Sequence, residues 1–134
     1  MINLQQLNIS NFITESGGYF EQIKLSYQLF GQKIGTAPVV LVNHALTGNS
    51  NVAGKDGWWK EIIGKNKAIN TNVYTVLCFN IPGNGFDGFV IDDYKEFIAR
   101  DVAKLFLIGL NELGINNLFA LIGGSLGGGI AWEM

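Results

Sequence analysis

The sequence predicts an α/β fold in which an antiparallel hairpin opens the chain and parallel strands alternating with helices follow. Residues 19–30 alternate between apolar and polar side chains, which is the period of a half-buried strand. Three later segments are short, continuous apolar runs, and such runs are typical of strands that are covered on both faces. A long segment of helical periodicity separates the last two runs, so strands and helices alternate along the chain.

The opening hairpin is predicted from the segments LNISNFIT (7–14) and YFEQIKLSYQLF (19–30). One face of the second segment carries its apolar side chains: Ile23, Leu25, Tyr27 and Leu29. The turn ESGG (15–18) between the segments contains adjacent glycines and is short enough to join antiparallel partners.

The parallel part of the sheet is predicted from the apolar runs APVVLVNH (37–44), VYTVLCFN (73–80) and NLFALIGG (117–124). These runs are rich in β-branched or aromatic residues, as buried strands are. GWWKEIIG (57–64) is predicted as a short helix after the first run, and residues 93–113 as a long helix after the second. Right-handed crossovers through these helices would make the three strands parallel.

The long helix carries its own start and stop signals. Asp93 followed by Glu96 fits a capping box, in which side chains satisfy backbone amides at the start of a helix. Gly114 follows the last apolar residue of the pattern, where glycine suits the left-handed turn that ends a helix. The predicted helix therefore runs from about Asp93 to Leu113.

Composition excludes several classes of function. The 134 residues fit one domain, 48% of them are hydrophobic, and the formal net charge is −2 with no cluster of basic residues. We therefore expect neither a nucleic-acid partner nor a membrane partner. The N-terminal MINLQQLNIS lacks the charged and then apolar pattern of a secretory signal, and the single cysteine, Cys78, lies in an apolar run. We expect a buried, reduced thiol in a cytoplasmic protein.

Two glycine motifs are candidates for chemistry, and the first is GNGFDG (83–88). It fits the G-x-G-x-x-G pattern of dinucleotide-binding loops and follows a predicted strand. In such a loop the third glycine opens a helix, whereas here FVIDDY follows and the predicted helix begins only at its aspartates. A turn-forming loop is the favoured interpretation, and a dinucleotide-binding domain is the alternative.

The second motif, GGSLG (123–127), fits G-x-S-x-G. It follows a predicted buried strand and precedes residues that can continue as a helix, which is the context of a nucleophile elbow. Such a turn forces the serine into strained dihedral angles and lifts its hydroxyl above the sheet. Ser125 is therefore the candidate nucleophile, and a glycine-rich turn that only packs tightly is the alternative.

An activated serine also needs hydrogen-bond donors for an oxyanion. In this architecture one donor is the residue after the nucleophile, here Leu126, and the other comes from the loop after the third strand. That loop is NHALTGNS (43–50), and it contains the single histidine, His44. The triad order of this architecture places acid and base after the serine, so His44 is expected to hold the loop by hydrogen bonds and not to act as the base.

Three segments resemble the homoserine O-acetyltransferases and their relatives in the α/β-hydrolase fold: HALTG (44–48), GWWKEIIGKNKAINTNVYTVLCFN (57–80) and LGINNLFALIGGSLGG (113–128). The resemblance covers most of residues 37–134, in the same order and at similar spacing. It departs from the family in two places. Leu126 stands where methionine is usual, and FNIPGNGFDGFVIDDY (79–94) lacks a longer Gly-Ser-Thr-Gly-Pro insert. The second departure leaves the acyl donor, acetyl or succinyl, and the acceptor open.

The resemblance implies a fold and a function. Residues 1–134 would be the N-terminal part of an α/β-hydrolase fold, from its first strand to the helix after the nucleophile, with no second domain. Ser125 would accept the acetyl group of acetyl-CoA and pass it to homoserine for methionine biosynthesis, while the amides of Leu46 and Leu126 form the oxyanion hole. The expected partners are small molecules, namely an acyl-CoA and homoserine or a similar alcohol. The resemblance implies no cofactor and no metal. It leaves open whether the full-length enzyme is a homodimer.

The triad acid and base are expected beyond residue 134, so we expect this chain alone to have little or no activity. A serine esterase on the same scaffold and a non-catalytic truncated product are the alternatives. Trp58 and Trp59 are interpreted as core or pocket wall. Asp87, Asp92 and Asp93 are interpreted as turn and cap residues without metal-ligand spacing.

Overall fold

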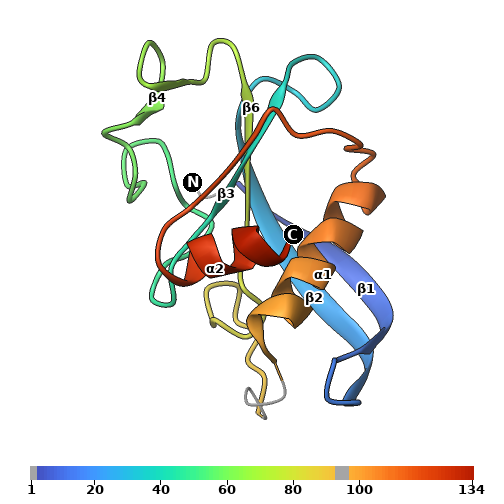
Figure 1. The fold of residues 1–134 in the computed structure, drawn as a ribbon. Helices are drawn as coiled ribbons and strands as arrows, with labels where there is room; N and C mark the ends of the chain where they lie inside the picture. Colours follow the sequence, from blue (N-terminus) through green and yellow to red (C-terminus); the bar gives the residue numbers. More distant parts are fainter. Residues whose placement is uncertain (1–2, 93–96) are drawn as a thin grey trace.

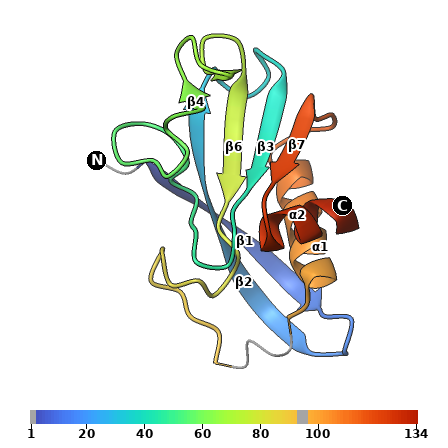
Figure 2. The same cartoon turned by 60° about the vertical axis from the view of Figure 1, so that its left-hand side comes forward.

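A five-stranded mixed sheet runs through the molecule, in a computed structural model that describes residues 3–92 and 97–134. Its strands, in spatial order, are β1 (Leu4–Ile13), β2 (Tyr19–Gly31), β6 (Thr75–Phe79), β3 (Val39–Asn43) and β7 (Ala120–Gly123) (Figure 1 and Figure 2). β2 pairs antiparallel with both β1 and β6, whereas β6, β3 and β7 run parallel (Figure 2). This order confirms the predicted α/β class, with an antiparallel opening and a parallel continuation.

β1 and β2 form the predicted hairpin. β1 begins at Leu4, earlier than predicted, and the register ends with Ile13 opposite Tyr19. The turn is closed by Thr14, whose Oγ1 accepts the Gly18 amide at 2.8 Å. The hairpin therefore follows from strand periodicity and a local turn signal.

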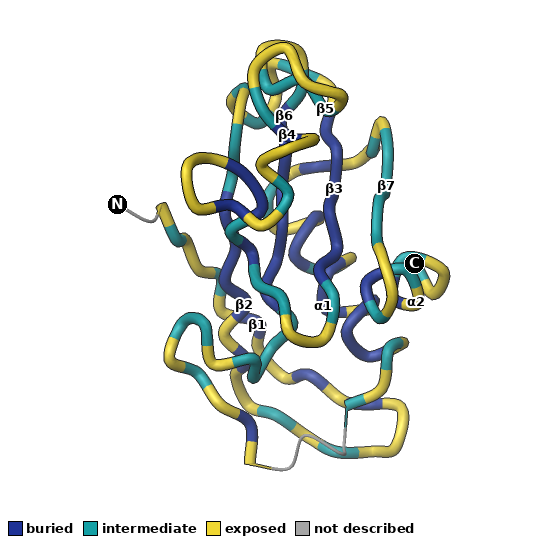
Figure 3. Tube along the Cα trace, turned by 90° about the vertical axis from the view of Figure 1, so that its left-hand side faces the viewer, coloured by how far each residue is buried: buried dark blue, intermediate teal, exposed yellow. Residues whose placement is uncertain are grey.

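The central strands are covered on both faces, as their apolar sequences predict. Every residue of β3 and β6 is buried (Figure 3). Helices α1 (Ala99–Glu112) and α2 (Leu126–Glu133) pack on one face, where Leu41 and Leu77 join Phe106 in one cluster. The other face packs a second cluster with the segment between β3 and β6: Val40, Val42, Val52, Ala53, Ile63, Val76 and Cys78. The buried position predicted for the thiol is thus confirmed.

The segment predicted as a short helix, residues 57–64, is not helical. It forms turns and enters the small parallel sheet of β4 (Ile63–Gly64) and β5 (Ile69–Asn70). The Trp59 amide donates to the carbonyl of Val52 at 3.0 Å, and the Trp58 amide donates to the carbonyl of Asn51 at 3.1 Å. The prediction was wrong because these tertiary hydrogen bonds replace a helix that is too short to be stable by itself.

α1 starts later than predicted and ends close to the predicted stop. The predicted capping box, Asp93 with Glu96, lies outside the described residues. The observed cap is the buried carboxylate of Asp101, whose Oδ2 accepts the Ile98 amide at 2.9 Å. Gly114 has a φ of 72° just after the helix, which confirms it as the stop. Within the described ranges, no helix has the length and apolar character to cross a membrane.

The G-x-G-x-x-G segment, residues 83–88, forms turns, as predicted. Its three glycines all lie in the left-handed region, with φ between 80° and 85°. Asp87 shapes one of these turns, since its Oδ1 accepts the Phe89 amide at 2.9 Å. The residues directly after Gly88 are not helical, so the segment lacks the helix N-terminus on which a dinucleotide site depends.

Candidate active site

The turn between β7 and α2 presents Ser125 at the surface. Its φ of 54° and ψ of −123° form a backbone conformation that residues with a side chain rarely adopt. Ser125 directly precedes α2, and it is exposed. The strained turn therefore holds a hydroxyl in the open at the carboxyl end of β7, which is the geometry of a nucleophile elbow.

Two glycines of the motif are required by the space round this turn. A Cβ atom on Gly123 would collide with the backbone of Gly127, and a Cβ atom on Gly127 would collide with the carbonyl of Asn43. A Cβ atom on Gly124, by contrast, would meet no heavy atom within 4 Å. The glycines two residues before and after Ser125 thus allow β7, α2 and the end of β3 to come into backbone contact.

The N-terminus of α2 lies at the same turn. Leu126 is the first residue of α2 and follows Ser125 directly. The first amides of an α-helix have no acceptor within the helix, and they carry partial positive charge. The Leu126 amide is therefore a donor beside the serine that favours negative charge.

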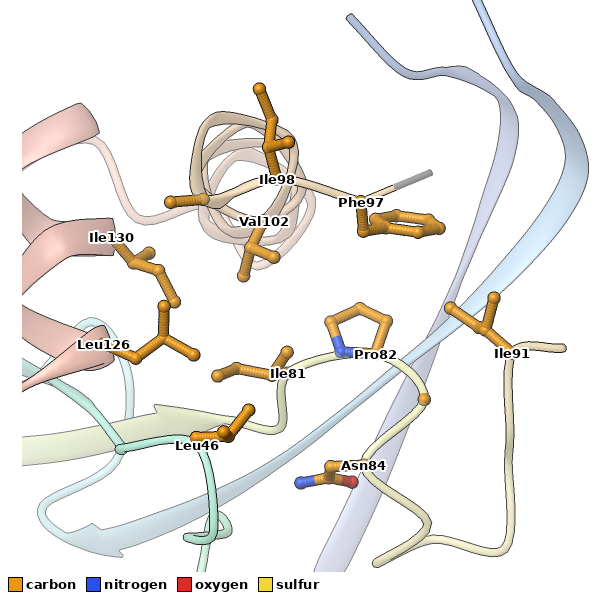
Figure 4. A pocket seen from close by; sticks show the side chains of 12 residues that line it. Leu46, Ile81, Pro82, Asn84, Ile91, Phe97, Ile98, Val102, Leu126 and Ile130 are labelled. Atoms are coloured by element: carbon orange, nitrogen blue, oxygen red, sulfur yellow. The ribbon is translucent and has the colours of Figure 1, made fainter. Parts of the chain in front are cut away.

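The segment of residues 44–50, hereafter the 44–50 loop, connects the end of β3 to the surface beside this turn. The Gly48 amide donates to the Ala45 carbonyl at 2.9 Å and closes a turn within the loop. Leu46 lies in that turn and is 73% exposed. Leu46 and Leu126 line the same cavity, whose volume is about 310 Å³, and both side chains point into it (Figure 4). The structure thus brings together two residues that are far apart in the sequence.

His44 is buried, and both of its ring nitrogens are occupied. Nε2 accepts the Ile81 amide at 2.9 Å, which assigns the proton to Nδ1, and Nδ1 donates to the Ala45 carbonyl at 2.6 Å. Burial lowers the pKa of the imidazole, and its bond to Ala45 offsets part of that shift. His44 therefore anchors the first residues of the 44–50 loop, as the sequence predicted, and has no free nitrogen to receive a proton from Ser125.

A polar cluster behind the loop, buried except for half-buried Asn84, was missed by sequence reasoning. Its members come from β2, from the 44–50 loop and from the residues after β6: Ser26, Gln28, Ser50, Asn80 and Asn84. Asn80 is 1% exposed and makes hydrogen bonds to three of the other four. The available signal was a polar residue at the end of the apolar run 73–80, where an apolar residue would be expected.

Asn43, the last residue of β3, was also missed. Its Nδ2 lies 3.5 Å from the carbonyl of Gly127, so it links β3 to α2. Its Oδ1 is buried and has no partner among the described residues. The sequence places this asparagine in an apolar run, but its neighbours in α2 are known only once the chain is folded.

Ser125 does not line the cavity shown in Figure 4 but borders a separate hollow of about 300 Å³, which Ala45 of the 44–50 loop also lines. Its walls include Trp58 and Trp59, whose ring centroids lie 4.6 Å apart. The Trp58 indole donates to the Asn49 carbonyl at 2.8 Å, which fixes the ring against the loop. The interpretation of both tryptophans as pocket wall is confirmed. Within residues 3–92 and 97–134, no cluster of three or more acidic, cysteine or histidine side chains could hold a metal ion.

Comparison with known proteins places this geometry in a family context. A family model described as alpha/beta hydrolase fold matches residues 38–134. The chain is 36% identical to the homoserine O-acetyltransferase of Corynebacterium glutamicum, over 90% of the chain and 35% of that protein. It is 33% identical to the homoserine O-acetyltransferase of Haloarcula marismortui, over 91% of the chain and 35% of that protein. The chain thus spans about a third of the length of these relatives.

Solved structures resemble the chain over almost its whole length. The homoserine O-acetyltransferase of Staphylococcus aureus superposes with a TM-score of 0.83 at 33% identity, over 98% of this chain and 41% of that one. Esterase E22 superposes with a TM-score of 0.81 at 28% identity, over 97% of this chain and 42% of that one. A transferase and an esterase therefore share this arrangement.

Proposed function

The chain belongs to the α/β-hydrolase fold family, and from that premise we propose that it carries the nucleophile of a serine acyltransferase of the homoserine O-acetyltransferase group. The single observation behind the proposal is the strained, exposed conformation of Ser125, with φ at 54° between β7 and α2. A serine in that position is free to attack a substrate carbonyl, and a residue held in strain of this kind is typical of functional sites.

The proposed reaction has two stages. In the first, Oγ of Ser125 attacks the thioester carbonyl of acetyl-CoA, its proton passes to a base, and CoA leaves with a proton as the thiol. In the second, the hydroxyl of homoserine attacks the acetyl-serine, which gives O-acetylhomoserine and restores the serine. The proposal needs no cofactor, because acetyl-CoA is a substrate.

We assign the oxyanion hole to the backbone amides of Leu46 and Leu126. Two facts support this assignment: both residues line one cavity, and Leu126 stands at the N-terminus of α2. Negative charge develops on the carbonyl oxygen in both stages, so donors fixed in advance stabilise both transition states. Losing one such donor typically costs about 10²–10³ in turnover.

The single histidine of the chain has no free ring nitrogen to act as the base, so we propose that the chain has little or no turnover alone. His44 is the single histidine, and its two nitrogens bond to Ile81 and Ala45. An acid and a base would have to come from residues outside these 134. A purified 134-residue chain that transfers acetyl groups at a normal enzymatic rate would contradict this part of the proposal.

The experiment measures acetyl-CoA consumption, with and without homoserine, by the full product of the gene that encodes these residues. We expect consumption that depends on homoserine and is abolished by Ser125→Ala. Ser10→Ala is the matched control, since Ser10 is an exposed serine on β1 and lines neither the cavity at Leu46 and Leu126 nor the hollow at Ser125. Equal consumption without homoserine would remove the transferase assignment.

A serine esterase is the second candidate, and the similarity to esterase E22 favours it. In that case water replaces the alcohol in the second stage, while the roles of Ser125 and of the two amides are unchanged. The same experiment separates the candidates, because an esterase would release acetate at a rate that homoserine does not change. A full gene product that shows neither activity would instead indicate a non-catalytic protein.

A further inference from the structure

We propose that Asn80 is a positioning residue, which holds the 44–50 loop so that the Leu46 amide stays aimed at the reacting carbonyl. The inference rests on the proposed function, because it assumes that this amide is an oxyanion donor. Asn80 itself lies behind the loop, 1% exposed, and does not line the cavity beside Leu46 and Leu126.

The Asn80 side chain uses every hydrogen bond that an amide can make. Its Oδ1 accepts the Ser50 amide at 2.8 Å and Nδ2 of Asn84 at 3.1 Å. Its Nδ2 donates to the hydroxyls of Ser26 and Ser50 at 2.8 and 2.9 Å. A backbone amide can only donate, so the Ser50 bond fixes which end of the side chain is oxygen. The orientation of Asn80 is therefore unique.

The loop is held at both ends by neighbouring residues after β6. Asn80 binds Ser50, the last residue of the loop, through two bonds. The next residue, Ile81, donates its amide to Nε2 of His44, the first residue of the loop. Leu46 lies between these two anchors in a turn that is itself closed by a hydrogen bond. An exposed residue in a loop is thus fixed by contacts that lie in the protein interior.

The anchor at Asn80 is connected to the sheet. Ser50 Oγ donates onward to Oε1 of Gln28 at 2.7 Å, and the Asn80 amide donates to the Ser26 carbonyl at 2.9 Å. All four residues are no more than 2% exposed. Inside a protein such bonds are strong, and a fully satisfied network specifies one arrangement of its members. The loop therefore takes its position from β2 and β6, two neighbouring strands of the sheet.

The expected consequence is kinetic. A donor that acts on the developing oxyanion contributes to the transition state and not to substrate binding, so its displacement lowers kcat and leaves KM unchanged. A misplacement of about 1 Å can cost about 10² in rate. Asn80→Asp keeps the shape of the side chain but turns an oxygen toward the Ser26 and Ser50 hydroxyls in place of the nitrogen.

The first experiment measures kcat and KM for the full gene product. We expect Asn80→Asp to lower kcat by about 10- to 100-fold with KM within about twofold. Ser50→Ala keeps the Ser50 amide bond and loses only the hydroxyl, so its effect should be smaller. Ile23→Val and Ile23→Ala are the controls, since Ile23 is fully buried, pairs with Ile9 and belongs to the core cluster of the helix face. If an Ile23 variant with the same loss of melting temperature loses the same kcat, the effect is one of stability and the inference fails.

The second experiment does not depend on catalysis and uses the same full gene product. Backbone ¹⁵N relaxation should give the Leu46 amide an order parameter near 0.85, typical of rigid backbone, in the unchanged chain and in Ile23→Val. In Asn80→Asp, and to a lesser degree in Ser50→Ala, that order parameter should fall toward about 0.6. An unchanged value in a folded Asn80→Asp chain overturns the inference, and it does so whether or not Ser125 proves to be a nucleophile.

Discussion

Gly127 shows at the residue scale why the turn that carries Ser125 tolerates no side chain two residues later. We expect Gly127→Ala to destabilise the fold by about 1–3 kcal/mol, because a Cβ atom there would collide with the backbone of Asn43 and His44. Gly129→Ala is the matched control in the same helix, where a Cβ atom would meet nothing within 4 Å. Since alanine favours helix by about 1 kcal/mol over glycine, Gly129→Ala should be neutral or stabilising in urea unfolding. Equal destabilisation by both variants would contradict this account.

His44 makes stability depend on pH. Its pKa is lowered in the fold by burial, so below the ordinary value of 6.5 the unfolded chain binds a proton that the folded chain resists. The stability that neutral His44 contributes to the fold is fully present above pH 6.5, and it is lost as the pH falls toward the pKa of His44 in the folded chain. We expect the free energy of unfolding to fall as the pH is lowered from 7.5 through 6.5, because the unfolded chain then takes up a proton that buried His44 does not.

The measurement is urea unfolding at several pH values for the unchanged chain and for His44→Gln. The variant has no histidine, so its curve should lack the decline between pH 7.5 and 5.5, whatever its absolute stability. A decline of the same size in the variant would assign the pH dependence to other groups.

The residues of the candidate site differ in how far the sequence could locate them. Ser125 was found at a strand-to-helix turn because its signal is contained in neighbouring residues, the glycines at 123 and 127 and the apolar run before them. Asn80 could not be found in the same way, because its partners Ser50 and Ser26 lie 30 and 54 positions away in the sequence. Hydrogen bonds of that separation exist only after the sheet has formed.

At the scale of elements, the start of α1 depends on one buried carboxylate. Asp101 accepts the Ile98 amide at 2.9 Å and the Glu15 amide at 2.8 Å, so it caps the helix and ties it to the hairpin turn. We expect Asp101→Ala to lower the free energy of unfolding by about 2–3 kcal/mol, because both amides lose their acceptor. Lys104→Ala is the control, since it removes an exposed ion pair to Glu15, and such pairs contribute about 0–1 kcal/mol. If both variants lose the same stability in thermal unfolding, Asp101 is not the residue that caps α1 and ties it to the hairpin turn.

The strands were predicted well because period and composition are local properties. The β3 and β6 runs are apolar throughout, and both strands are buried on two faces. Residues 57–64 were predicted wrongly for a physical reason: their pattern is that of a short helix, but their amides bond to residues 51 and 52. Tertiary hydrogen bonds override a weak local preference, and a single sequence does not display them.

At the scale of the whole molecule, β7 lies at one edge of the sheet and pairs only with β3 among the described strands. Two large aromatic side chains on the adjoining segments are open to solvent: Phe119, directly before β7, is 63% exposed and Trp132, on α2, is 92% exposed. An unpaired edge next to exposed aromatic surface favours association between copies. We expect the weight-average mass of the 134-residue chain in sedimentation to rise with its concentration.

Phe119→Lys with Trp132→Lys should suppress that rise, because two charges would then border the open edge. Tyr19→Lys is the control, since this tyrosine is similarly exposed, at 59%, but lies at the far hairpin. A constant mass in the unchanged chain, or equal suppression by the control, would show that β7 is not the associating surface.

The buried position of Cys78 makes its thiol a probe of how often the fold opens. Cys78 is the fourth of the five residues of β6, its side chain has no exposed surface, and burial raises the pKa of its thiol. A thiol-specific dye in solution can reach it only when the residues packed over it, among them Val52 and Ala53, move away, so the rate of colour development measures how often this face of the sheet opens. Because the chain has a single cysteine, the rate refers to one site and requires no engineered label.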